Sequence, residues 1–297
     1  MKELVRMDSL QKYISDGKKA SEVSGFLGSS DLTPIQREWL TKKLEKSDCF
    51  EKMRLQYFVG KALGGKNGEK YILKQQKGEI PPGDIIFIMV SGDGGMDIGM
   101  GSAIGTALRG HRLLIFEYDN GGYMNTGYQL SYSTPLGARS STSHVGKTQY
   151  GKTFLQKDMP KIMAATGIPY VATVAESNPA DFMKKAAKAA HYAKTSGTAY
   201  VKAISACPLN WNDKPATERR VIEAAVNCCY FPLYEIEQGV MKLSYNPEKN
   251  GKKIPVTDWL AMMGRTKHLL KEEYSEVTER LQNEVDARFS ELIKWAE

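Results

Sequence analysis

The sequence has few cysteines and no long apolar runs. Its 297 residues include four cysteines, and nowhere are two of them spaced as Cys-x-x-Cys. So few cysteines in a chain of this length do not suggest the disulfide framework of a small secreted protein. No apolar stretch approaches the ~20 residues that a membrane-spanning helix requires, and residues 1–6 lack the apolar core of a signal peptide. These absences predict a cytoplasmic protein with no membrane partner.

Charge is not concentrated in any one region either. The formal net charge is +7, and the basic residues are scattered apart from short pairs such as Lys42-Lys43 and Lys184-Lys185. The sequence contains no cluster of basic and aromatic residues of the kind that is typical of a nucleic-acid-binding surface. We therefore expect no nucleic-acid partner. A moderate positive charge is compatible with an anionic cofactor or with acidic partner proteins.

Apolar runs of strand length alternate with helix-forming segments from residue 84 onward. Strands are expected at 84–90, 112–118, 169–174, 198–204 and near 233–236, and helices at 98–108, 158–166, 179–195 and 216–229. This alternation predicts an α/β fold, in which a mostly parallel sheet carries helices on both faces. The long loop between residues 120 and 157 is of a length that is usually functional.

Helical segments flank this region. Residues 35–46 follow a good helix start, residues 50–63 suggest a second helix, and the charged amphipathic segment 269–297 suggests a third. We therefore divide the chain into a helical N-terminal extension, 1–48, an α/β domain, 49–240, and a C-terminal helical tail, 241–297.

Two glycine-rich segments directly follow two of the expected strands. The first is Gly92-Asp93-Gly94-Gly95 and the second is Asp119-Asn120-Gly121-Gly122. Each alone is also an ordinary turn sequence. Together they lie where parallel sheets bind ligands, at the carboxyl ends of strands, and glycine lets the backbone approach a ligand closely. Asp93 and Asn120 offer the oxygen ligands that Mg²⁺ prefers, usually together with phosphates. The pair predicts a diphosphate held through magnesium.

The ordered run of segments from Gly92 to about Gly239 resembles the thiamine diphosphate-binding (β) subunit of the 2-oxoacid:ferredoxin oxidoreductases, the pyruvate:ferredoxin oxidoreductase family. The matching segments are Gly92–Gly99, Tyr118–Asn120, Tyr123–Gly127, Ser133–Gly137, Ile168–Thr173, Cys207–Trp211 and Phe231–Glu235. The resemblance implies the thiamine diphosphate-binding α/β fold for residues 49–240.

The resemblance also implies roles for single residues. Mg²⁺ would be bound by Asp93, the side chain of Asn120 and the backbone carbonyl of Gly122. Asn125 would be catalytic, because its amide can hydrogen-bond the substrate carbonyl beside the thiazolium. A helix starting near Asp97 would direct its positive end at the diphosphate. The implied cofactor-binding residues are Gly92, Asp93, Gly94, Gly95, Asn120, Gly122, Tyr123, Asn125 and Thr126.

The implied activity is oxidative decarboxylation of a small 2-oxoacid, with or without coenzyme A. Electrons would pass to ferredoxin or another acceptor through partner subunits. An α-type subunit would complete the site with a carboxylate for the aminopyrimidine, so the chain alone should be inactive. Two alternatives remain: a non-oxidative decarboxylase or carboligase of the same architecture, and a non-catalytic assembly subunit that kept the fold.

The chain departs from the family in its cysteines. Members usually hold a [4Fe–4S] cluster through an N-terminal Cys-x-x-Cys pair, a third cysteine and one in the Cys-Pro segment, and thiolates are the ligands required. Here only Cys207 matches, and Cys49, Cys228 and Cys229 are interpreted as buried structural thiols. We therefore expect no four-cysteine cluster in this chain and expect partner subunits to carry iron–sulfur clusters.

A second departure concerns the substrate. Arg139 stands where pyruvate-type members have an aromatic residue, and a guanidinium can pair with a carboxylate. Arg139 or His144 could therefore contact the substrate or a neighbouring subunit, although a plain surface position is the alternative for Arg139. The identity of the 2-oxoacid, the acceptor and the subunit stoichiometry stay open.

Overall fold

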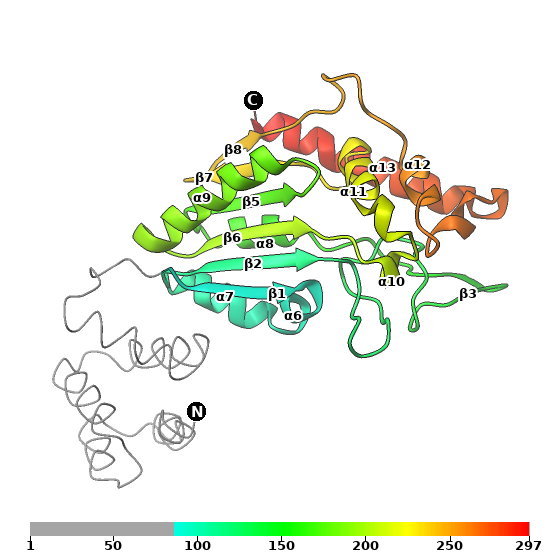
Figure 1. Cartoon of the computed structure of the whole chain (residues 1–297), viewed down its shortest axis with the longest axis horizontal. Helices are drawn as coiled ribbons and strands as arrows, with labels where there is room; N and C mark the ends of the chain where they lie inside the picture. The colour runs from blue at the N-terminus through cyan, green and yellow to red at the C-terminus, as the bar shows by residue number, and fades with distance from the viewer. Residues whose placement is uncertain (1–85, 297) are drawn as a thin grey trace, which may run out of the picture. The chain divides into compact units, whose positions relative to one another are not determined.

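A six-stranded sheet with the strand order β1-β2-β6-β5-β7-β8 forms the centre of the structure (Figure 1). The structure is a computed structural model that describes residues 86–296. Its strands are β1 (Ile88–Gly92), β2 (Leu114–Asp119), β5 (Tyr170–Ala175), β6 (Ala199–Ile204), β7 (Tyr234–Glu237) and β8 (Val240–Leu243). The first four strands of this order run parallel, whereas β7 and β8 are antiparallel to their neighbours. The helices expected at 35–46 and 50–63 lie outside the described residues.

Helices cover both faces of the sheet. They are α6 (Asp93–Ile98), α7 (Met100–Leu108), α8 (Met159–Ala164), α9 (Pro179–Thr195), α10 (Pro208–Trp211), α11 (Glu218–Asn227), α12 (Val256–Ala261) and α13 (Ser275–Ala296). Short 3-10 turns at Pro215–Thr217, Lys267–Leu270 and Glu272–Tyr274, and a small hairpin of β3 (Val145–Gly146) and β4 (Gln149–Tyr150), complete the elements. The predicted α/β fold with a mostly parallel sheet is confirmed.

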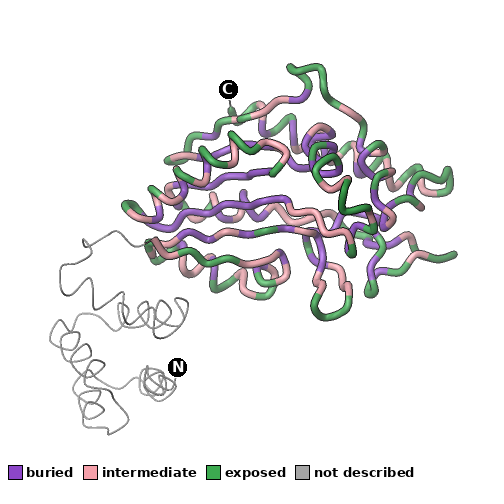
Figure 2. Tube along the Cα trace, in the orientation of Figure 1, coloured by how far each residue is buried: buried purple, intermediate pink, exposed green. Residues whose placement is uncertain are grey.

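Successive side chains of a strand point to opposite faces of the sheet, so each strand contributes to two separate cores. In β2, Leu114 lies in the core under α9, while its neighbour Ile115 lies in the opposite core under α6, α7 and α8. All six residues of β5 and of β6 are buried, as expected for parallel strands covered on both sides. Figure 2 shows these strands as the buried centre of the unit. The predicted helix 179–195 is confirmed by α9.

The start of the first helix differs from the sequence-based expectation. Strand β1 extends to Gly92, and α6 begins at Asp93, so the first glycine-rich segment is a helical turn rather than a loop that precedes a helix near residue 98. Gly92 is the N-cap, and an acidic residue in the first turn is favourable because it faces the positive end of the helix dipole.

The C-terminal part of the chain joins the same sheet and core. The β7–β8 hairpin turns at Gln238 and Gly239, both with positive φ, the backbone that a tight two-residue turn requires. Position 240, where we expected the α/β domain to end, is the first residue of β8. Residues Ile86–Glu297 form one compact unit by their contacts. None of the helices described between residues 86 and 296 is long and apolar enough to cross a membrane.

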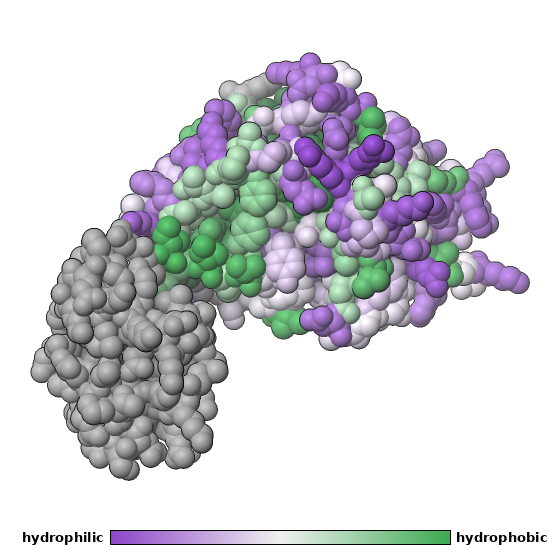
Figure 3. All heavy atoms as spheres, viewed as in Figure 1, coloured by the Kyte–Doolittle hydropathy of each residue, from purple (hydrophilic) through white to green (hydrophobic). Residues whose placement is uncertain are grey.

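The edge strand β1 exposes apolar side chains. Ile88 and Val90 are 53% and 62% exposed, and Tyr118 of the adjacent β2 is 44% exposed. Helix α9 packs on β5, β6 and β2, and Figure 3 shows hydrophobic residues gathered over the part of this face where Figure 1 draws β1 and β2. An apolar surface of this kind is typical of a protein interaction site.

Candidate functional site

The carboxyl ends of β1 and β2 bring the two glycine-rich segments together. Gly92 lies opposite Tyr118 in the parallel register. The Tyr123 hydroxyl donates a hydrogen bond of 2.8 Å to Asp97 Oδ2, linking the chain after β2 to α6. A Cβ on Gly94 would lie 2.7 Å from the Tyr123 ring. Glycine at position 94 therefore allows α6 and the chain after β2 to touch.

Two buried oxygens in these segments have no hydrogen-bond partner among the described residues. They are Asp93 Oδ2 and Asn120 Oδ1. Asp93 is 2% exposed, and burial, followed by the charge of Asp119, raises the pKa of Asp93 to about 7. A buried carboxylate oxygen without a partner is costly. A carboxylate and an amide oxygen are ligands of the type that Mg²⁺ prefers, so both residues fit a bound magnesium ion.

Residues 119–122 are called the metal loop, because Asn120 and Gly122 are expected Mg²⁺ ligands. Lys202 anchors this loop through Asp119. The Lys202 ammonium lies 2.7 Å from Asp119 Oδ2, and the other carboxylate oxygen of Asp119 accepts the Gly121 N–H at 2.8 Å. Burial would raise the pKa of Asp119, but the charge of Lys202 and its hydrogen bond outweigh burial and lower it. Asp119 therefore stays ionised and is committed to Lys202 and the loop backbone.

The first turn of α6 has no side-chain cap. The N–H groups at the start of a helix lack partners within the helix, so the turn that contains Gly94 and Gly95 leaves donors for an anion. A Cβ on Gly95 would lie 2.2 Å from Ser91 Oγ. Because Gly94 and Gly95 have no Cβ, a ligand can come close to the backbone of this turn, next to Asp93.

Asn125 and Thr126 occupy a different environment. The backbones of Tyr123 and Gln129 pair through hydrogen bonds of 3.0 and 3.1 Å, which closes a narrow hairpin loop. Asn125 and Thr126 lie at its exposed tip, where the Thr126 hydroxyl donates to Gln129 Oε1. The structure therefore brings Asp93, the metal loop and Tyr123 together, and leaves Asn125 and Thr126 outside this buried cluster.

A buried charge network behind the site escaped the sequence analysis. Glu117 is fully buried in β2 and lies 3.6 Å from Lys157 and 3.5 Å from Lys202. Lys157 also forms a short ion pair with Asp97, and the Tyr200 hydroxyl donates to Glu117. A charged residue within an otherwise apolar strand, as at Glu117 and Lys202, is the signal that could have revealed this network.

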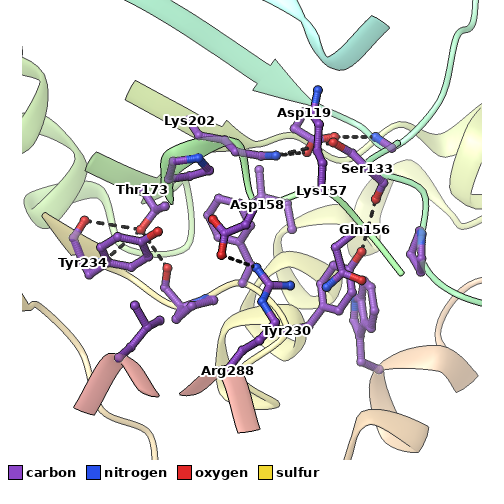
Figure 4. Close-up of a pocket in the computed structure, with 18 of the residues that line it drawn as sticks. Asp119, Ser133, Gln156, Lys157, Asp158, Thr173, Lys202, Tyr230, Tyr234 and Arg288 are labelled. Atoms are coloured by element: carbon purple, nitrogen blue, oxygen red, sulfur yellow. Dashed lines mark hydrogen bonds and ion pairs between the residues drawn. The ribbon is translucent and has the colours of Figure 1, made fainter. Parts of the chain in front are cut away.

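A cavity of about 60 Å³ lies behind the metal loop. Figure 4 shows Asp119, Lys202, Gln156 and Tyr230 around it. Gln156 has a buried amide without a hydrogen-bond partner. Because one buried water needs roughly 10–15 Å³, this space suits a few ordered water molecules rather than a cofactor.

Arg139 and His144 are both exposed. The backbone of Arg139 is fixed, because its N–H donates to the Arg265 carbonyl at 2.9 Å and its carbonyl accepts the Tyr128 hydroxyl at 2.7 Å. The arginine that reaches the buried site is Arg265, which is 2% exposed and which the sequence analysis missed.

The cysteines occupy two kinds of position. Cys207 is half-buried and is the N-cap of α10, whereas Cys228 and Cys229 are buried, and burial raises the pKa of Cys229 to about 12. The interpretation of these two as buried thiols is confirmed, although α11 ends at Asn227 and not at residue 229. Cys49 lies outside the described residues. Within residues 86–296, no group of three or more His, Cys, Asp or Glu side chains is placed to hold a metal ion.

The sequence of this chain is similar to those of several known proteins. Residues 62–203 match the family model described as thiamine pyrophosphate enzyme, C-terminal TPP binding domain. The chain is 40% identical over 217 residues to pyruvate synthase subunit PorB of Methanocaldococcus jannaschii. The aligned segment covers 73% of this chain and 70% of that protein. It is 36% identical over 215 residues to ketoisovalerate oxidoreductase subunit VorB of Pyrococcus furiosus, covering 72% of this chain and 66% of that protein.

Chains of solved structures are also similar to this chain, and one of them is an oxidoreductase. It is the 2-oxoglutarate:ferredoxin oxidoreductase from Magnetococcus marinus with 2-oxoglutarate, coenzyme A and succinyl-CoA bound, which is 25% identical and covers 46% of this chain and 44% of that chain with a TM-score of 0.37. The family is established by the sequence matches to PorB and to the thiamine pyrophosphate domain. This chain belongs to the thiamine diphosphate-binding (β) subunits of the 2-oxoacid:ferredoxin oxidoreductases.

Proposed function

We propose that this chain holds thiamine diphosphate through Mg²⁺ in a complex that oxidatively decarboxylates a 2-oxoacid. The metal ligands would be Asp93, the Asn120 side chain and the carbonyl oxygen of Gly122, with diphosphate oxygens and water completing the coordination. The observation that carries this proposal is the pair of buried oxygens without partners, Asp93 Oδ2 and Asn120 Oδ1, at adjacent strand ends. No hydrogen bond to the Gly122 carbonyl occurs among the described residues, which leaves it available as well.

When bound, thiamine diphosphate supplies a nucleophilic carbon for the 2-oxo group and a ring that accepts the electron pair left by CO₂. The residues of this chain would position the cofactor and neutralise the charge of its diphosphate. The N–H groups of the first turn of α6 would face the diphosphate, and the Tyr123–Asp97 hydrogen bond holds α6 against the metal loop. The Asn125 amide would hydrogen-bond the substrate carbonyl, with Tyr123 and Thr126 near the cofactor.

The exposure of Asn125 supports an incomplete site in this chain alone. An α-type subunit would cover the hairpin tip, supply the carboxylate for the aminopyrimidine and exclude water. The apolar side chains exposed on β1 also suit a protein partner. Exposed Arg139 and His144 stay candidates for contact with the substrate or that subunit. The predicted cytoplasmic location is part of the same proposal.

Electrons would leave through iron–sulfur clusters in further subunits and reach ferredoxin or another acceptor. One observation favours the alternative of a non-oxidative decarboxylase or carboligase: the sequence has no Cys-x-x-Cys pair. The names of the relatives, pyruvate synthase and ketoisovalerate oxidoreductase, suggest the oxoacids to test.

The test uses the complex that co-purifies with the tagged full-length chain. Pyruvate, 2-oxoisovalerate or 2-oxoglutarate is supplied with Mg²⁺ and thiamine diphosphate, and CO₂ release is measured with and without coenzyme A and an electron acceptor. We expect release that requires the acceptor. Release without an acceptor would support the non-oxidative alternative, and full activity of the chain by itself would contradict the shared site.

A further inference from the structure

Two successive carbonyl groups of the metal loop are each held by two side-chain donors. The carbonyl oxygen of Asn120 accepts hydrogen bonds from Asn210 Nδ2 at 2.7 Å and from Trp211 Nε1 at 2.6 Å. The carbonyl oxygen of Gly121 accepts from Arg265 Nη1 at 3.1 Å and from Thr134 Oγ1 at 2.9 Å. The next carbonyl, that of residue 122, accepts no hydrogen bond within the described part of the chain.

The donors come from a buried and mutually supported group. Asn210, Trp211 and Arg265 are each 2% exposed. The Arg265 guanidinium lies over the Trp211 ring, 5.0 Å from its centroid, and the Arg265 N–H donates to the Trp211 carbonyl. Figure 1 shows α10, which carries Asn210 and Trp211, beside the chain that leaves β2.

Asn210 also fixes the next residue by contact. A Cβ on Gly122 would lie 2.7 Å from Asn210 Nδ2, so the Asn210 amide packs directly on the Gly122 backbone. Fixing the carbonyls of Asn120 and Gly121 sets their peptide planes. Together these contacts determine where the Asn120 side chain and the Gly122 carbonyl can point.

We infer that Asn210, Trp211 and Arg265 are positioning residues that set the affinity of the metal loop for Mg²⁺. They do this by directing Asn120 Oδ1 and the Gly122 carbonyl toward the ion without touching it. The inference rests on the proposed function, because it assumes that these two oxygens bind the metal. It adds that the geometry of the site depends on α10 and on the segment after α12.

The test compares two tryptophan variants that make the same chemical change. Trp211→Phe keeps an aromatic ring and removes the N–H that holds the Asn120 carbonyl. Trp259→Phe is the matched control, because Trp259 is also fully buried and its Nε1 has no hydrogen-bond partner. Asn210→Leu removes the second donor to the same carbonyl.

Mg²⁺ is titrated calorimetrically into the co-purified complex at saturating thiamine diphosphate, and the unfolding temperature is measured without metal or cofactor. We expect Trp211→Phe to raise the half-saturating Mg²⁺ concentration about threefold, as for the loss of one hydrogen bond. The Trp211→Phe/Asn210→Leu double variant should raise it more than the product of the single effects, because the buried carbonyl then loses both donors. Trp259→Phe should leave it unchanged, and excess Mg²⁺ should restore cofactor binding to Trp211→Phe.

Equal Mg²⁺ affinity in wild type, Trp211→Phe and the double variant would overturn the inference. An equal loss of affinity in Trp211→Phe and Trp259→Phe, in step with unfolding temperature, would also overturn it, because it would indicate a purely structural role. A wild-type complex that binds no Mg²⁺ with thiamine diphosphate would instead contradict the proposed function itself.

Discussion

Replacing Gly94 by alanine tests the contact between the two glycine-rich segments. A Cβ at this position would lie 2.7 and 3.0 Å from two carbons of the Tyr123 ring. The ring cannot move away freely, because its hydroxyl is hydrogen-bonded to Asp97. Helix propensity alone favours alanine over glycine by about 1 kcal/mol. Overpacking costs about 1–3 kcal/mol, and breaking a hydrogen bond to a charged group costs about 1.5–3 kcal/mol more.

The matched control is Gly101→Ala in the neighbouring helix α7, where no atom lies within 4 Å of an added Cβ. We expect Gly101→Ala to stabilise the chain by up to about 1 kcal/mol and Gly94→Ala to destabilise it by about 1.5–5 kcal/mol. Urea unfolding of both variants and the wild type measures the difference. If Gly94→Ala is as stable as Gly101→Ala, the close packing of α6 against Tyr123 is refuted.

Two further changes probe the buried lysines. Lys202→Met leaves the buried carboxylate of Asp119 without its cation and leaves Glu117 with Lys157 alone, so urea unfolding should show a loss of about 3–5 kcal/mol; a loss below 1 kcal/mol would refute this role. Burial lowers the pKa of Lys152 to about 7, so the folded chain binds fewer protons than the unfolded chain above pH 7. Stability should therefore rise with pH from about 7 toward 10. Lys152→Met should remove this rise, and an unchanged pH profile of unfolding would contradict it.

The sequence alone predicted the α/β fold class and the position of Asp93 and Asn120 after two adjacent strands, whereas their role as metal ligands stays a prediction. Strands β5 and β6 could be recognised from the sequence as apolar runs of strand length, because all of their residues are buried in the fold. Strand β8 was missed because it has only four residues and exposes Val240, so no apolar run marks it. The early start of α6 was missed because glycines at 94 and 95 resemble a turn.

The donors that hold the metal loop could not be predicted from local patterns. Asn210 and Trp211 lie 90 and 91 residues from Asn120 in the chain, and Arg265 lies 144 residues from Gly121. Only the folded chain brings them together. Asn210 and Trp211 fall in a segment that resembles the family, but resemblance alone gave them no role.

The central claim is that Asp93 holds the cofactor through a divalent cation. The most direct measurement is calorimetric titration of thiamine diphosphate into the complex formed by the full-length chain, with and without Mg²⁺, for wild type and Asp93→Asn. The wild-type complex should bind the cofactor only when Mg²⁺ is added, and Asp93→Asn should bind at least tenfold more weakly, because about 1.4 kcal/mol of lost metal binding already gives that factor. Equal, Mg²⁺-independent binding by both complexes would contradict the account.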